Sequence, residues 1–368
     1  MRLTNEWWLI LWMFTGGAAL ACFFPRHQEL VLGKWQRRWG IVPAVLCVLP
    51  YILWAGFRGD FGDTYVYRMD FLATPDAFRD IPLYLESVKK DRGFYAVMAV
   101  IHCLIEDQAE LYLMIMAAFQ ILTVAFVCRK YTENYWLSIF IFIASTDYLS
   151  WVWNGMRQFT AVVLVFSGTG LIVQKKYGKA VLCVLAASLF HQSALLMLPV
   201  IFLLQGKPWN KKTLSAIGLS VLALVFAGRF TSLLDLALAD TQYTNVVSDW
   251  VAGGDDGTNP LRVLVYAMPM LLSVVGYRSV RRQEDPLVCV GVNAAILTAC
   301  IGIISIGTSG IFIGRLPIYV SCISNWILLP WEIENLFSPK TAKGVLAVTV
   351  LCYLCFFYYQ MHVAWAVF

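Results

Sequence analysis

Charged residues are scarce in this sequence, so it has little material for a surface that faces water. Only 14% of its 368 residues are Asp, Glu, Lys or Arg, 60% are hydrophobic, and the mean hydropathy is +0.68. Soluble globular domains carry about 25% charged residues, and these values therefore exclude that class. The net charge of +5 is spread over many short segments instead of forming one basic block, which argues against a nucleic-acid partner.

The sequence also lacks the motifs that bind nucleotides or build common hydrolase sites. It contains no Walker A loop, no G-x-G-x-x-G motif and no G-x-S-x-G motif. Its ten cysteines lie mostly inside apolar runs, where we expect small packing residues instead of metal ligands. We therefore predict no metal and no cofactor.

Long hydrophobic runs are abundant, and they recur from end to end at the length of about 20 residues that a helix needs to cross a bilayer. The runs predict an all-α fold with about twelve transmembrane helices, some of them re-entrant or broken. We expect one integral membrane domain over residues 1–368. The predicted spans are 7–24, 39–57, 110–127, 135–153, 156–173, 178–190, 192–205, 213–228, 261–277, 287–307, 311–329 and 344–367.

Basic residues in the short connections predict the orientation of these spans. Cytoplasmic loops are enriched in Lys and Arg. The basic loops are 25–38, 128–134, 174–179, 205–212, 278–286 and 331–343. They share one side only if 94–105, which is too short to cross, dips in and returns, and if 180–204 breaks into two half-helices at 190–192. The outer face then includes the loops 58–109 and 229–260.

Polar residues gather on this outer face, beginning directly after the second span. The stretch Gly56-Phe-Arg-Gly-Asp-Phe-Gly-Asp-Thr-Tyr-Val-Tyr67 contains Arg58, Asp60, Asp63 and Tyr67. Two carboxylates beside an arginine could supply a base or orient a substrate hydroxyl. They could equally pair with one another in a capped loop, and the sequence leaves both interpretations open.

The motif Asn154-Gly-Met-Arg-Gln-Phe-Thr-Ala161 places Arg157 and Gln158 in the first turn of a predicted helix. Unpaired backbone N–H groups and the helix dipole favour an anion there, and a guanidinium binds phosphate bidentately. We predict a diphosphate ligand; the alternative is an interfacial arginine that reaches lipid headgroups. In Leu189-Phe-His-Gln-Ser-Ala194, His191 sits at the predicted break, either as a general base or acid or as a packing residue.

Two later arginines each precede a tyrosine by four residues. Arg262 precedes Tyr266, and Arg315 precedes Tyr319. A spacing of four puts both members on one helix face, and several arginines at membrane depth indicate an anionic ligand. The acidic segment 229–260, which also carries Tyr243 and Trp250, is either a lid that holds sugars or an ordinary solvated loop.

Together these residues resemble the EpsG family, the Wzy-like polymerases of bacterial exopolysaccharide, capsule and O-antigen. The resemblance covers about residues 40–330. It rests on Arg58 with Asp63 and Tyr67, on Asn154 to Ala161, on Phe190 to Ala194 and on the later arginines. One departure is Lys90-Asp-Arg-Gly-Phe94, because family members tend to carry a glutamate just before the Gly-Phe pair. In this sequence Arg92 occupies that position, and the nearby acid is Asp91, one residue earlier.

The resemblance implies a multi-pass glycosyltransferase of GT-C-like architecture in the bacterial inner or cytoplasmic membrane, with its active site facing the periplasm or the outside. It would polymerise undecaprenyl-diphosphate-linked oligosaccharides, both donor and acceptor, without a soluble cofactor. Other implied partners are membrane lipids and a chain-length regulator. His191, Asp63 and Arg157 would carry the chemistry. The implied substrate-binding residues are Arg58, Asp60, Tyr67, Gln158, Arg262, Tyr266, Arg315 and Tyr319.

Two other function classes remain open from the residues alone. A transporter or flippase of lipid-linked oligosaccharides would also need a cationic cavity and broken helices, but it favours internal repeats, which the sequence does not show. A membrane acyltransferase would need a histidine paired with an acid, for which Asp107 and Asp147 are poor candidates.

Overall fold

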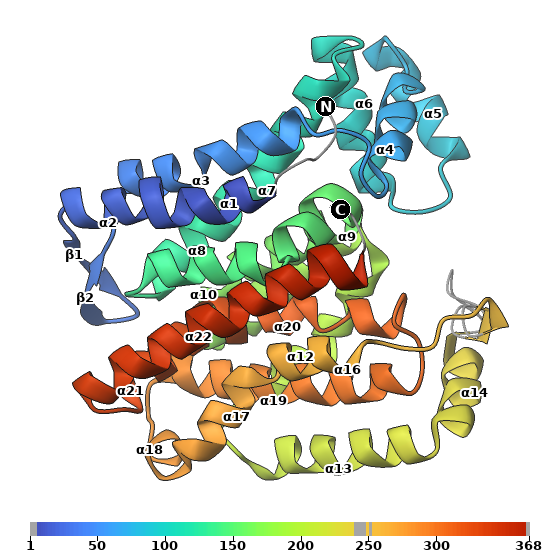
Figure 1. The fold of residues 1–368 in the computed structure, drawn as a ribbon. Coiled ribbons are helices and arrows are strands. Elements are labelled where there is room, and N and C mark those ends of the chain that lie inside the picture. The colour runs from blue at the N-terminus through green and yellow to red at the C-terminus, as the bar shows by residue number, and fades with distance from the viewer. Residues whose placement is uncertain (1–5, 239–247, 250–251, 366–368) are drawn as a thin grey trace. The chain divides into compact units, whose positions relative to one another are not determined.

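The computed structural model describes residues 6–238, 248–249 and 252–365, and its elements are labelled in Figure 1. The chain divides into two compact units, which we describe separately. Unit 1 comprises Met1–Gly170, Gly178–Leu195 and Lys343–Phe368; unit 2 comprises Leu171–Tyr177 and Leu196–Ala342. The single membrane domain expected over residues 1–368 stays a prediction.

Unit 1 is helical apart from one hairpin, in agreement with the predicted all-α class. Its elements are α1 (Trp7–Trp12), η1 (Met13–Gly17), α2 (Ala18–Phe23), β1 (His27–Val31), β2 (Lys34–Arg38), α3 (Ile41–Gly56), α4 (Thr64–Leu72), η2 (Phe78–Asp80), α5 (Ile81–Ser87), α6 (Arg92–Ile105), α7 (Ala109–Tyr131), α8 (Tyr135–Ala144), η3 (Tyr148–Asn154), α9 (Met156–Ser167) and α11 (Tyr177–Ser188). The C-terminal α22 (Pro339–Tyr359) and η7 (Gln360–Ala364) complete it.

The basic segment 25–38, which its sequence predicts to be a loop, forms the antiparallel hairpin β1–β2. Glu29 of β1 pairs with Arg129 of α7, and Arg38 Nε donates to the Lys130 carbonyl oxygen at 3.0 Å. The hairpin and the α4–α6 cluster lie at opposite ends of α3 and α7 (Figure 1). Arg58, which follows α3, is therefore far from the basic hairpin. The predicted topology, which puts the hairpin inside and Arg58 outside, stays a prediction.

Unit 2 is built around the long helix α19 (Pro286–Ile306). Its other elements are α12 (Met197–Leu203), α13 (Lys211–Val225), α14 (Ala227–Leu238), α16 (Pro260–Tyr266), α17 (Met268–Val275), α18 (Tyr277–Arg281), η5 (Ile313–Arg315), α20 (Ile318–Ile323), η6 (Ser324–Leu328) and α21 (Leu329–Asn335). Helices α13, α16, α17 and α20 pack against α19. Side chains of Asn210, Asn259 and Asp285 cap α13, α16 and α19 by accepting from backbone N–H groups.

Fewer helices than expected are long enough to cross a membrane. Among the described residues, three pass by length and apolarity: Ala109–Tyr131, Pro286–Ile306 and Pro339–Ala364. The number rises to five if each of two bent pairs counts as one span. The prediction of about twelve spans is thus not confirmed. One physical reason is bending: predicted span 135–153 turns by 67° between α8 and η3, and α13 meets α14 at 106°.

Of the two segments on which the predicted topology depends, 180–204 has the expected break, whereas 94–105 lies in one unbroken helix and its dip into the membrane stays a prediction. Helix α11 ends at Ser188, a 3-10 turn η4 (Gln192–Leu196) follows, and α12 begins at Met197, so the apolar stretch 180–204 is broken around His191. Helix α6 has 14 residues, about 21 Å at 1.5 Å per residue, and is too short to cross about 30 Å of hydrocarbon. Segment 229–260 is not all loop, because α14 occupies its first part.

Candidate functional site

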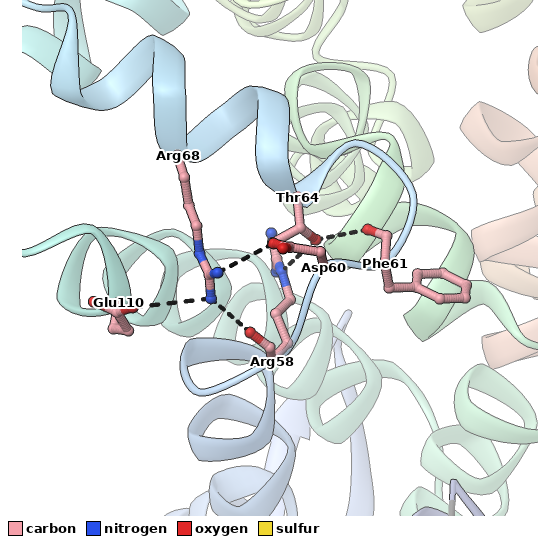
Figure 2. Close-up of polar contacts among 6 residues, drawn as sticks. All are labelled: Arg58, Asp60, Phe61, Thr64, Arg68 and Glu110. Carbon is pink, nitrogen blue, oxygen red and sulfur yellow. Dashed lines mark hydrogen bonds and ion pairs between the residues drawn. The ribbon is translucent and has the colours of Figure 1, made fainter. Parts of the chain in front are cut away.

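Arg58 leaves the end of α3 and turns inward. Its side chain is buried, with 2% of the residue exposed. Nε donates to Thr64 Oγ1 at 3.1 Å and Nη1 donates to the Val152 carbonyl oxygen at 3.1 Å, while the guanidinium lies over the Trp153 ring. Figure 2 shows the bond to Thr64, whose hydroxyl in turn donates to the Phe61 carbonyl oxygen. Arg58 thus connects the end of α3 to η3 through its hydrogen bond to Val152.

Arg68 of α4 also contacts the loop between α3 and α4. It pairs with Asp60 at 3.1 Å, donates to the Arg58 carbonyl oxygen at 2.7 Å and approaches Glu110 of α7 at 3.9 Å (Figure 2). Asp60 is therefore engaged by Arg68, a residue that the sequence analysis did not single out. This arrangement matches the capped-loop alternative for Asp60 and leaves its role as a sugar ligand a prediction.

Asn154 connects this loop to the helix that carries Arg157. Its Oδ1 accepts from the backbone N–H of Asp63 at 3.1 Å, and its carbonyl oxygen accepts from the Tyr67 hydroxyl at 3.2 Å. Tyr67 is buried, whereas Asp63 is exposed at the start of α4. The two motifs that the sequence analysis treated separately are therefore one bonded structure.

Arg157 is the second residue of α9, as its motif predicted. Its side chain is 38% exposed and pairs with the Asp91 carboxylate at 3.2 Å. It also lies over the Tyr95 ring, 5.9 Å from the centroid, and the Tyr95 hydroxyl donates to Asp70 at 3.2 Å. A guanidinium at a helix N-terminus that is still 38% exposed can bind an anion.

Asp91 is the main residue of this site whose role the sequence left undecided. Its side chain is only 5% exposed, and its backbone is left-handed with φ of 54°. Burial raises the pKa of its carboxyl, although the positive charges of Arg157 and Lys90 and a hydrogen bond from the Gln192 N–H oppose that rise. The displaced acid before the Gly-Phe pair thus reaches Arg157 after all. The sequence shows an acid near the Gly-Phe pair, but it does not show that Arg157 is the partner of this acid.

The start of α6 also brings the His191 segment to this site. The backbone N–H of Gly93 donates to the Leu189 carbonyl oxygen at 2.8 Å. His191 follows two residues later, and its Nδ1 is 2.6 Å from the Ser193 hydroxyl. Gln158, next to Arg157 on α9, is buried. Unit 1 therefore brings the segments of Arg58, Asp63, Arg157 and His191 into one network of contacts.

Replacing Asp91 by asparagine should lower activity by about tenfold or more, because Arg157 would lose its charged partner and its fixed position. The same change mimics protonation of the carboxyl. Since the pKa of Asp91 is raised, the wild type should lose the ion pair, and activity with it, at a higher pH than an ordinary aspartate would. Initial rates against pH measure both effects. Asp76→Asn, at a side chain that is 96% exposed, is the matched control.

The later arginines belong to unit 2. Arg262 lies over the Tyr266 ring at 5.4 Å from the centroid, which confirms that this pair shares one helix face. Arg315 ends the 3-10 turn η5, whereas Tyr319 is buried in α20, so the α-helical spacing assumed for that pair was wrong. The physical reason is Leu316-Pro317, which lies between the two elements and whose proline has no backbone N–H to continue a helix. Tyr243 and Trp250 lie outside the described residues.

Comparison with known families assigns the chain to one of them. The family described as EpsG matches residues 41–366, which is nearly the whole sequence. The chain belongs to the EpsG family. Its membership and its apolar helices indicate a membrane protein of polysaccharide biosynthesis with a polymerase-like glycosyltransferase function. No curated protein and no solved structure matches the chain.

Proposed function

We propose that this EpsG-family chain is a Wzy-type polymerase, which joins undecaprenyl-diphosphate-linked oligosaccharides on the outer face of the bacterial cytoplasmic or inner membrane. The observation that supports this most is Arg157, which is half-exposed at the start of α9 and held by Asp91. Such a cation suits a diphosphate, and a lipid-linked diphosphate is the leaving group that a transferase outside the cytoplasm has at hand.

In the reaction, a hydroxyl oxygen of the acceptor sugar attacks the anomeric carbon of the donor glycan. The bond from that carbon to the diphosphate oxygen breaks, and its electron pair leaves with undecaprenyl diphosphate. Arg157 stabilises the negative charge that develops there. The hydroxyl proton passes to a base, for which we propose His191 or Asp63. Asp91 keeps Arg157 in place throughout.

The remaining assignments are proposals of the same kind. Arg262 and Arg315 would contact diphosphate or sugar. Tyr67, Gln158, Tyr266 and Tyr319 are buried and would act by supporting the residues beside them. Arg58 and Asp60 would act by shaping the loop between α3 and α4, because both are engaged by protein groups. We further propose a GT-C-like architecture, multi-pass insertion, and a chain-length regulator as partner.

Purified full-length protein, incubated with its native lipid-linked repeat unit, tests the proposal directly. We expect a ladder of products on a gel, each longer than the last by one repeat unit. Failure of the wild type to extend the repeat unit, together with transfer of intact units across the bilayer of reconstituted vesicles, would assign the chain to the transporter class instead.

Replacing His191 by alanine separates the two proposed bases. General base catalysis is worth about 10² to 10⁴ in rate, so a loss of that size would identify His191 as the base. Ser193→Ala should cause a smaller loss, because Ser193 only orients the ring through Nδ1. His27→Ala on the exposed hairpin is the control. A full rate in His191→Ala with a large loss in Asp63→Asn would identify Asp63 instead.

A further inference from the structure

One carboxylate in unit 2 collects an unusual number of donors. Asp255 accepts from the Ser309 hydroxyl at 2.6 Å and from the backbone N–H groups of Gly310 at 2.9 Å and Ile311 at 3.0 Å. It also accepts from the N–H of Gly257 at 3.1 Å. Hydrogen bonds to a charged acceptor are roughly twice as strong as neutral ones. The segment before α16 is therefore fixed to the turn that precedes η5.

Backbone packing around the carboxylate is equally close. Thr258 N–H donates to the Ser305 carbonyl oxygen at 2.9 Å. A Cβ on Gly314 would lie 2.2 Å from the Thr258 hydroxyl, and a Cβ on Gly257, whose φ is +94°, would lie 2.3 Å from the Ile306 carbonyl oxygen. No larger side chain fits at either glycine. The two segments thus meet in direct contact.

This contact continues to Arg315. The Ser309 hydroxyl, which donates to Asp255, also accepts from the Phe312 N–H at 2.9 Å. The Ser309 carbonyl oxygen accepts from the Gly314 N–H at 2.9 Å, and Gly314 directly precedes Arg315. Asp255 is therefore bonded directly to residues 309–311, and through Ser309 to Phe312 and to Gly314, the residue before Arg315.

We propose that Asp255 is a positioning residue for Arg315: it locks the turn 309–314 so that this arginine is held ready for an anionic substrate. The inference rests on the proposed function for the identity of the substrate, a lipid-linked diphosphate. The latch, by which we mean the hydrogen bonds that Asp255 accepts from residues 309–311, rests only on the contacts above. Asp255 itself is not a catalytic residue, because it acts through Arg315.

The electrostatics of Asp255 support a permanent latch. Burial by itself would raise the pKa of this carboxyl, but the hydrogen bonds from Ser309, Ile311, Gly310 and Gly257 outweigh it and leave the pKa below its usual value. A lowered pKa means that the bonds persist at neutral pH and are lost only as the pH falls through that lowered value. Asp255→Asn removes the charge under all conditions and is the appropriate probe.

The test compares Asp255→Asn with Asp256→Asn, its exposed neighbour, in the purified full-length protein. Hydrogen exchange of residues 307–315 reports the latch, and binding of undecaprenyl diphosphate together with the polymerisation rate reports Arg315. We expect at least about tenfold faster exchange and an apparent KM for the donor raised by about tenfold to a hundredfold, with kcat less affected. Asp256→Asn should match the wild type in every measurement.

Each outcome decides one part of the inference. Unchanged exchange in Asp255→Asn would show that no latch exists, and faster exchange with unchanged donor KM and unchanged diphosphate binding would show that the latch does not position Arg315. If Asp255→Asn does not fold, Ser309→Ala replaces it, since it removes one bond to the carboxylate and should show the same pattern in weaker form. A wild type that binds undecaprenyl diphosphate without polymerising would refute the proposed function alone, because the binding comparison still measures the latch.

Discussion

Replacing Arg157 by alanine is expected to lower polymerisation by about 10² to 10³-fold. The magnitude is that of removing one donor which stabilises charge developing on a leaving group. Because the side chain is 38% exposed, its removal leaves no large cavity and should not unfold the protein. The change also leaves the buried Asp91 carboxylate without its charged partner, so a lower free energy of unfolding is expected beside the loss of activity.

Product ladders and initial rates from the full-length protein measure this effect. Arg157→Lys keeps the charge but loses the planar bidentate geometry, so an intermediate rate is expected. Arg79→Ala, at an arginine that is 87% exposed on η2, is the matched control and should retain the wild-type rate. Equal rates for Arg157→Ala and Arg79→Ala would remove Arg157 from the site.

Replacing Arg58 by methionine is expected to give the largest loss of stability. The change removes two hydrogen bonds that a buried guanidinium makes to Thr64 and Val152, each worth about 1.5 to 3 kcal/mol for a charged donor. The free energy of unfolding should therefore fall by roughly 3 kcal/mol or more. Activity should fall with it, because η3 leads directly into Asn154 and Arg157.

Arg68→Met is the comparison for this experiment. Arg68 also contacts the loop, but its ion pairs involve Asp60 and Glu110, which are more than half exposed, and exposed pairs contribute about 0 to 1 kcal/mol. Unfolding transitions of the two variants in the same detergent measure the difference. A similar loss in both would mean that the buried hydrogen bonds of Arg58 contribute no more to stability than the exposed ion pairs of Arg68.

Most of the predicted motifs could be assigned to local structure from the sequence because their signals are local. Asn154-Gly-Met-Arg157 opens α9 as expected, the apolar stretch around His191 breaks where a polar turn interrupts it, and α19 nearly coincides with its predicted span. The predicted number of about twelve spans is not confirmed, since three to five described helices are long and apolar enough to cross a membrane. Hydrophobicity measures how well a segment avoids water, but it does not distinguish a lipid-facing helix from a bent or short one packed inside protein.

The amino-acid sequence by itself determined that this chain is a helical membrane protein of the EpsG family, and which polar residues could bind an anion. Only the tertiary structure decided which of these residues meet. Arg58 donates to the Val152 carbonyl oxygen and Tyr67 to that of Asn154, and Asp255 accepts from two backbone N–H groups of the turn before η5. Backbone groups are chemically alike at almost every residue. A partner of that kind therefore leaves no mark in the sequence, and it becomes specific only when folding brings one particular peptide group within reach.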